Sequence, residues 1–176
     1  MKLHLGSGPI RLDEWINIDL DSPAADVLMD LRKPLPYADR SIDYVFAEHF
    51  IEHISRPEAV ALLKECRRVL NPTGVIRLST PDIQHIIDAY TRNDVGRWGN
   101  LWQPRNRCHL LNEAFYNWGH RFLYDADELR LLLSEAGFSD IQFVPWRESS
   151  FAALNNIECR PFNHELIIEA SGEAAS

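Results

Sequence analysis

Residues 3–19, LHLGSGPIRLDEWINID, decide the fold of this chain. They contain a short apolar run, two glycines one residue apart, and a second apolar run that ends in an acid. Glycines after a strand let the backbone turn sharply and approach a ligand with no Cβ in the way. A carboxylate at the end of the following strand can accept hydrogen bonds from both hydroxyls of a ribose. The stretch therefore predicts a nucleotide-binding half-fold.

The pattern is incomplete, because Pro9 follows Gly8 and the usual third glycine is missing. An ordinary tight turn between two strands is the alternative interpretation. Residues 6–14 separate the two apolar runs, whereas a helical crossover needs about ten to twelve residues or more. We therefore predict a shortened first crossover, formed by a loop or a single turn.

The composition limits the function classes. A length of 176 residues with 45% hydrophobic and 25% charged residues is typical of one soluble globular domain. No apolar run approaches the roughly twenty residues of a membrane span, and no signal peptide is expected. A net charge of −8 disfavours a broad nucleic-acid surface. Cys66, Cys108 and Cys159 form no CxxC pair, so we expect a reducing, cytoplasmic location.

Strands and helices alternate along the chain. The predicted strands cover residues 15–20, 26–31, 42–47, 75–79, 141–146 and 164–169 after the first one, and the predicted helices cover 55–70, 83–90 and 126–136. Such alternation indicates a doubly wound α/β sheet of parallel strands, which binds ligands beyond the carboxyl ends of its strands. Gly6, Asp19, Asp30, Glu48 and Thr80 all stand at those ends.

The order of the motifs resembles that of class I S-adenosylmethionine-dependent methyltransferases. LHLGSG, INID and MDL resemble the first three motifs, and residues 41–54 resemble the fourth-strand motif. Residues 65–74, ECRRVLNPTG, and residues 129–138 resemble two later helices of that superfamily. The resemblance implies a Rossmann-like, mostly parallel seven-stranded sheet whose last strand runs antiparallel between the fifth and sixth. It also implies S-adenosylmethionine as the cofactor.

The resemblance assigns roles to the first two strand ends. Gly6, Ser7 and Gly8 would pass under the methionine part and the ribose of the cofactor. Asp19 would hold the ribose hydroxyls, and Leu20 would lie against the adenine. An aspartate at a strand end is also a common turn or cap residue, so this alternative remains open for Asp19.

The next two strand ends would complete the cofactor site. By the same resemblance, Asp30 would accept a hydrogen bond from the adenine amino group, beside the backbone amide of Leu31. Ala47 and Glu48 would lie near the methionyl end. A simple pairing of Asp30 with Arg32 or Lys33 is the alternative for this acid.

Residues 49–53, HFIEH, match the HxxEH motif of inverted zinc peptidases. That motif needs a helix, whereas this match directly follows a predicted strand, and no third ligand is identifiable. We therefore expect no metal site, and a zinc hydrolase is a minor alternative. His49, nearer the strand end, is the predicted base for a hydroxyl acceptor, and His53 is a second catalytic candidate with a structural alternative. An amine or thiolate acceptor would need no base, because alignment alone can supply much of the catalysis.

Residues 91–124 interrupt the alternation with an aromatic and arginine-rich segment. We predict a substrate-side insert or flap over the acceptor, and an oligomer interface is the alternative. Rings and guanidiniums together suit a sugar, a phosphorylated sugar or an aromatic acid. His109 and His120 lie here and could complete a base or metal site with His49, although a satisfied or exposed structural histidine is the favoured alternative for each.

The main functional prediction is methyl transfer from S-adenosylmethionine by direct displacement. The expected acceptor is a small molecule, such as a sugar or glycan precursor or another hydroxyl or amine compound. A non-catalytic cofactor-binding or regulatory module on the same fold is the alternative. We expect one domain over residues 1–170, a flexible tail over 171–176, no nucleic-acid or membrane partner, and a homodimer as one way to bury the uncovered sheet edge.

Overall fold

The computed structural model describes residues 1–160 and 164–172 of the chain. Its strands form one seven-stranded sheet of order β3-β2-β1-β4-β5-β7-β6. The strands are β1 (Lys2–Leu5), β2 (Ile16–Asp19), β3 (Val27–Leu28), β4 (Ile42–Glu48), β5 (Leu70–Pro81), β6 (Asp140–Phe143) and β7 (Glu165–Ser171). Strand β7 runs antiparallel between β5 and β6, and the other neighbours pair in parallel. The predicted topology is confirmed.

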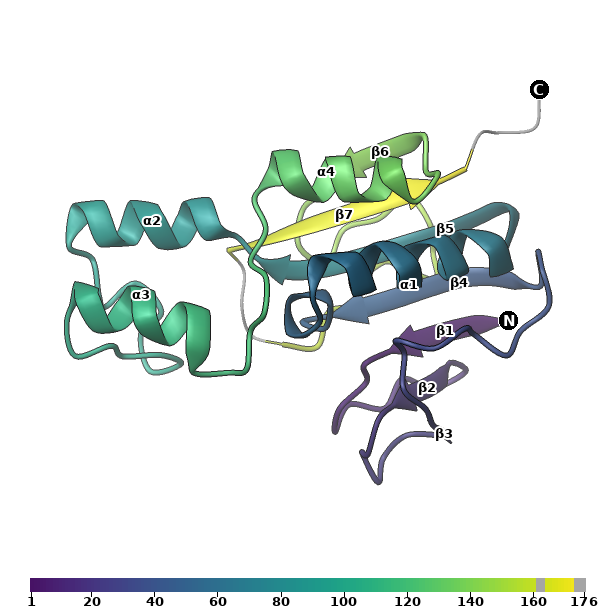
Figure 1. Ribbon diagram of the computed structural model, residues 1–176, viewed down its shortest axis with the longest axis horizontal. Helices are drawn as coiled ribbons and strands as arrows, with labels where there is room; N and C mark the ends of the chain where they lie inside the picture. The colour runs from purple at the N-terminus through teal and green to yellow at the C-terminus, as the bar shows by residue number, and fades with distance from the viewer. Residues whose placement is uncertain (161–163, 173–176) are drawn as a thin grey trace.

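The helices are unevenly placed around this sheet. They are α1 (Arg56–Val69), α2 (Ile83–Arg92), α3 (Arg107–Tyr116) and α4 (Ala126–Glu135), with a single 3-10 turn, η1 (Ile51–His53). Helices α1 and α4 cover the same face of the sheet, whereas α2 and α3 lie together beyond one end of it (Figure 1). Within the described residues, no helix has the length and apolar character needed to cross a membrane.

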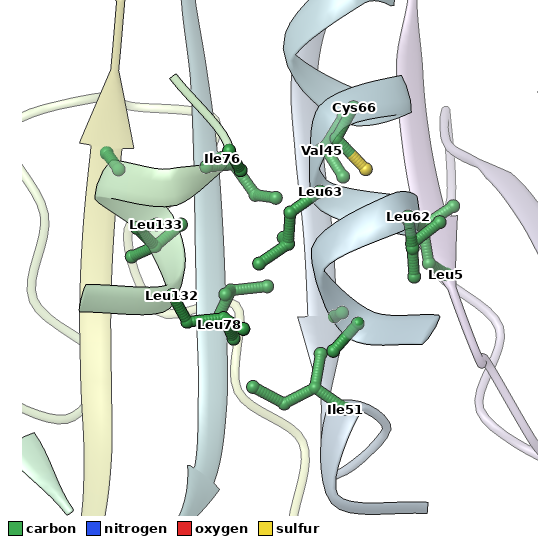
Figure 2. Packing of buried hydrophobic residues seen from close by; sticks show 14 of the residues in the cluster. Leu5, Val45, Ile51, Leu62, Leu63, Cys66, Ile76, Leu78, Leu132 and Leu133 are labelled. Carbon is green, nitrogen blue, oxygen red and sulfur yellow. The ribbon is translucent and has the colours of Figure 1, made fainter. Parts of the chain in front are cut away.

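The main core lies between the sheet and the pair α1 and α4. Successive side chains of a strand point to opposite faces, so Val45 of β4 and Ile76 and Leu78 of β5 share the helix-covered face. Leu63 of α1 and Leu132 of α4 pack on them (Figure 2). Each fully buried side chain of this kind contributes roughly 1.5–3 kcal/mol to folding. This core fixes the strand ends that carry the site.

A long connection between β6 and β7 covers the opposite face of the sheet. Its residues Leu154 and Ile157 pack with Phe46 of β4 in a second apolar cluster. Arg77 of β5 is fully buried on the same face and forms ion pairs with Glu158 and Glu169. The connection is therefore fastened to the sheet by a buried ionic group as well as by apolar contacts.

The first crossover contains no helix, as its spacing predicts: residues 6–15 form turns. The predicted α1 start is also confirmed, because Ser55 and Glu58 form a capping box. Residues 91–124 begin with the last two residues of α2 and contain one complete helix, α3, which packs against α2. Gly137, with a φ of +93°, follows α4 as expected of a helix-ending glycine.

Several predicted strand limits are wrong. The third strand, predicted over residues 26–31, is limited to Val27–Leu28, because Arg32 folds back onto the Asp30 carboxylate. Strand β5 begins at Leu70, whereas a turn over residues 71–74 was predicted to precede it. Leu70 pairs with Ile42 and Val75 pairs with Tyr44, so residues 71–74 form an irregular part of the strand where the register with β4 shifts. The predicted sixth strand over residues 141–146 ends at Phe143, since Pro145 has no N–H to donate.

The last strand also differs from the prediction over residues 164–169. It covers Glu165–Ser171, so Ser171 is paired with Val75 and is part of the sheet, where a flexible tail over 171–176 was expected. The rest of that tail, residues 173–176, and residues 161–163 of the β6–β7 connection lie outside the described residues.

Candidate active site

The turn after β1 brings the backbone close to its surroundings. Gly6 and Gly8 have φ values of +63° and +54°, a region that side chains other than glycine rarely adopt. A Cβ on Gly6 would lie 2.2 Å from the Phe50 ring, so only glycine fits there. A Cβ on Gly8 would meet only the Arg160 guanidinium, at 3.8 Å. The Gly8 backbone is therefore open to a ligand on its Cβ side.

Asp19, at the end of β2, faces this glycine turn. Its Oδ2 accepts a hydrogen bond from the Gly8 N–H at 2.8 Å, and its Oδ1 accepts one from the Ser22 N–H at 3.2 Å. A carboxylate has about four lone-pair positions, so further donors can still bind to it. The next residue, Leu20, is 59% exposed at the rim of the sheet. These positions fit the ribose and adenine roles that the resemblance implies.

Asp30 is engaged by a neighbour. Arg32 donates to its two carboxylate oxygens from Nε at 2.8 Å and from Nη2 at 2.9 Å. These hydrogen bonds lower the pKa of Asp30 to about 2. The side chain of Leu31 is buried in the main core, so only its backbone could meet a ligand. An adenine amino group would have to share Asp30 with Arg32.

Glu48, at the end of β4, is buried beside Ala47 and receives the β6–β7 connection. Its carboxylate accepts hydrogen bonds from the backbone N–H groups of Cys159 and Arg160 at 3.0–3.2 Å. Burial raises the pKa of Glu48. Ser7 Oγ and Arg160 Nε are buried without a hydrogen-bond partner among the described residues. Unpaired buried polar atoms are costly, so this edge fits a polar ligand that would bind to them.

A pocket of about 450 Å³ opens beyond the ends of β4 and β5, between the sheet and the α2–α3 pair. Three tryptophans and several histidines line it, including Trp98, Trp102, Trp118, His53 and His120. Among the described residues, the arginine that lines this pocket is Arg160 of the β6–β7 connection. No arginine of the 91–124 insert lines it. The insert therefore contributes rings to the pocket and not the guanidiniums expected from sequence.

His49 is held between two carboxylates. Its Nδ1 lies 3.1 Å from Glu52 Oε1, and its Nε2 is paired with Glu165. The carboxylates outweigh the effect of burial and raise the pKa of His49 to about 9. Both ring nitrogens of His49 thus face carboxylates, although its side chain is part of the pocket lining. A role as proton acceptor would require one of these pairs to open.

His53 is the last residue of η1, four residues after His49, and its ring contacts that of His120. The backbone carbonyl of Glu52 accepts hydrogen bonds from the N–H groups of Arg121 and Phe122, at 2.7 and 3.2 Å. This pairing brings His120 to His53, with their ring centroids 5.0 Å apart. His109, by contrast, is exposed on α3 and lies 3.3 Å from Glu113.

The comparisons with known proteins agree with this geometry. A family profile of methyltransferase domains matches residues 12–142. The chain belongs to this methyltransferase domain family.

Individual relatives are distant. The chain is 26% identical to a demethylmenaquinone methyltransferase of Staphylococcus saprophyticus over 115 residues, which are 61% of this chain. It spans only 46% of the length of that relative. A methyltransferase of Archaeoglobus fulgidus has a similar fold, with a TM-score of 0.61, 16% identity, and coverage of 97% of this chain and 85% of that one. A methyltransferase of Methanosarcina mazei gives a TM-score of 0.57, 15% identity, and coverage of 97% and 91%.

The sequence analysis named the glycine turn and the strand ends that carry Asp19, Asp30 and Glu48, which we call the donor edge. It missed much of the pocket lined by tryptophans and histidines, which we call the acceptor pocket. Arg160 and Glu165 belong to a connection and a strand that carried no motif, and His85 of α2 was not singled out. The aromatic density of residues 91–124 was the available signal for the pocket. The contacts of His49 with two glutamates had no signal, because one of them, Glu165, is far along the chain.

Proposed function

We propose that this chain transfers a methyl group from S-adenosylmethionine to a hydroxyl group of a small molecule, such as a sugar or glycan precursor. The observation that carries the proposal is the pocket of tryptophans and histidines directly beside the donor edge. Arg160 belongs to both, since it lies over Gly8 and lines the pocket. Indole rings suit the apolar face of a sugar, while imidazoles can bind its hydroxyls.

On the donor side, we propose that Gly6, Ser7 and Gly8 lie under the ribose and methionine parts. Asp19 would accept hydrogen bonds from the ribose hydroxyls, and Leu20 would cover one side of the adenine. The contact of Asp19 with the Gly8 amide supports this placement, because it holds the carboxylate at the glycine turn.

The remaining donor contacts would come from the ends of β3 and β4. Asp30 and the Leu31 backbone would meet the adenine edge, while Ala47 and Glu48 would lie near the methionyl group. S-adenosylmethionine would supply a methyl group on its sulfonium. The acceptor oxygen would take this methyl by direct displacement as the S–CH3 bond breaks to leave S-adenosylhomocysteine, and the hydroxyl proton would pass to a base beside it or to water.

On the acceptor side, His53 is the better placed of the two catalytic candidates. It lines the pocket and is not held between two carboxylates as His49 is. We propose that the reacting hydroxyl lies beside His53, and that residues 91–124 form the cover of the acceptor. His49 would hold the pocket wall through Glu52 and Glu165.

A non-catalytic cofactor-binding module is the second candidate. His49, the base predicted from the sequence, is held between Glu52 and Glu165, which favours a module that binds the cofactor without catalysing transfer.

The test has two stages. Calorimetry with S-adenosylhomocysteine should give one binding event per chain, and a panel of sugars, nucleotide sugars, acids and amines should then reveal a methylated product by mass spectrometry. Binding without any product across the panel would favour the non-catalytic module, and no binding at millimolar ligand would contradict both.

A further inference from the structure

We propose that Glu52, His53 and His120 form a binding site for one divalent transition-metal ion, with Zn²⁺ as the best match, in the wall of the acceptor pocket. One ligand atom of each residue lies within 4.8 Å of the other two. His53 and His120 line the pocket, and Glu52 lies beside them with no exposed surface. Two imidazoles and one carboxylate are a common ligand set of zinc sites that keep a fourth position open.

The hydrogen bond of His120 orients it as a ligand. Its Nδ1 lies 2.6 Å from the backbone carbonyl oxygen of Ala114. A carbonyl can only accept, so Nδ1 carries the proton and Nε2 carries the lone pair. Metal-ligating histidines generally donate their other N–H to such an oxygen, which fixes the ring and its tautomer.

Glu52 is held in a comparable way. Its Oε2 accepts a hydrogen bond from Thr80 Oγ1 at 3.0 Å, and its Oε1 lies 3.1 Å from His49 Nδ1. A second carboxylate, that of Glu165, pairs with the other side of His49. The buried cluster thus brings two carboxylates together around one imidazole, and a cation would offset the remaining negative charge.

The distances allow binding after a small adjustment. Zinc lies about 2.0–2.2 Å from nitrogen and oxygen ligands, which places tetrahedral ligands about 3.4 Å apart. The three residues therefore need to approach by roughly 1–2 Å, which a side-chain rotation can supply.

This site differs from the one in the peptidase motif. HxxEH would use His49 and His53 as ligands from one helix, but η1 is a single 3-10 turn and His49 is paired with two glutamates. The third ligand, His120, comes from the end of the 91–124 insert and reaches η1 because Arg121 and Phe122 bind the Glu52 carbonyl. This combination of ligands was not predicted from sequence, because the pairing that brings His120 to η1 is long-range.

With the ion bound, His53 would be a ligand and not a base, and the ion would instead favour the ionised form of an acceptor hydroxyl that contacts it. That consequence rests on the proposed function, whereas the binding of the ion does not.

The test uses the full chain after removal of metal by a chelator and dialysis. Calorimetric titration with Zn²⁺ should show one ion bound per chain. Co²⁺ in the same site should give the visible absorption that is typical of four-coordinate cobalt. His120→Asn keeps a donor for the Ala114 carbonyl but lacks Nε2, so its affinity for Zn²⁺ should fall about a hundredfold or more, because even loss of a ligand's hydrogen-bond partner costs 10- to 100-fold. His109→Asn is the matched control, and its affinity should be unchanged.

Binding of S-adenosylhomocysteine by His120→Asn serves as the folding control, because that ligand would use the glycine turn. Substoichiometric Zn²⁺ in the wild type, or equal affinities for wild type and His120→Asn, would overturn the metal site. Zn²⁺ binding without S-adenosylhomocysteine binding would instead overturn the proposed function and leave the metal site standing.

Discussion

The donor edge and the acceptor pocket are built from different kinds of contact. At the donor edge, Gly8 in the turn after β1 meets Asp19 at the end of the neighbouring strand β2, only eleven residues away in sequence. At the acceptor pocket, His49 meets Glu165, which is 116 residues away. The first kind of contact follows from local spacing and strand order, while the second depends on where long connections return to the sheet.

The β6–β7 connection links the two regions. It supplies the amides that bind Glu48 at the donor edge, and its Arg160 lines the acceptor pocket. Arg77 of β5 holds the connection to the face of the sheet that it covers, through the ion pair with Glu158. Changes in this connection should therefore affect both regions, whereas changes within either region should affect one.

The largest effect should come from Arg77→Met. The substitution would leave Glu158 buried without its guanidinium, and loss of one partner of a buried ion pair costs about 3–5 kcal/mol. Urea unfolding should show this loss in the free energy of unfolding. Lys64→Met, on the exposed side of α1, is the control and should change stability by about 0.5 kcal/mol or less. Equal effects of the two variants would show that the connection is not held by this ion pair.

A pair of glycine substitutions compares the two regions directly. Gly6 and Gly99 have φ values of +63° and +56°, but a Cβ at Gly6 would overlap the Phe50 ring whereas one at Gly99 meets nothing within 4 Å. Gly99→Ala should cost about 1–2 kcal/mol from backbone strain alone. Gly6→Ala should cost more, by roughly 1–3 kcal/mol from overpacking.

Thermal and urea unfolding of both glycine variants measure this difference. Equal losses of stability would mean that the Phe50 ring moves away at little cost, and the close approach at Gly6 would then have no energetic importance.

Asp19→Ala should weaken binding of S-adenosylhomocysteine by about tenfold or more, equivalent to about 1.4 kcal/mol or more. The substitution removes the carboxylate that is proposed to hold the ribose. Asp19→Asn keeps one acceptor oxygen for the Gly8 amide and should lose less affinity. Calorimetry on both variants is the measurement, and wild-type affinity in Asp19→Ala would exclude the ribose role.

The smallest effect concerns the pH dependence of stability at Asp26, just before β3. Hydrogen bonds from Asn17 lower the pKa of Asp26 to about 2, below its usual value of about 3.9. A lowered pKa contributes stability that is present above pH 4 and lost as the pH falls toward 2. The stability of Asp26→Asn should therefore fall less steeply over this window than that of the wild type. Asp13→Asn, at an exposed residue, is the control; a wild-type slope in Asp26→Asn would contradict the assignment.

The parts that sequence predicted are those with local causes. The strand order, the helix-free first crossover and the Ser55–Glu58 cap follow from motif order, spacing and residue type. The early start of β5 at Leu70 did not, because pairing with Ile42 outweighs the turn residues that follow it. The same reason explains the acceptor pocket: tryptophans indicated a pocket, but only tertiary pairing decides that His120 meets His53 and that Arg160 meets Gly8.

The central claim is that the donor edge and the acceptor pocket form one continuous active site. A crystal structure with S-adenosylhomocysteine tests it most directly. We predict that the ribose hydroxyls lie within hydrogen-bond distance of the Asp19 carboxylate and that the sulfur faces the pocket lined by His53 and Trp102. A nucleoside bound away from Asp19, or a sulfur directed away from that pocket, would contradict the account.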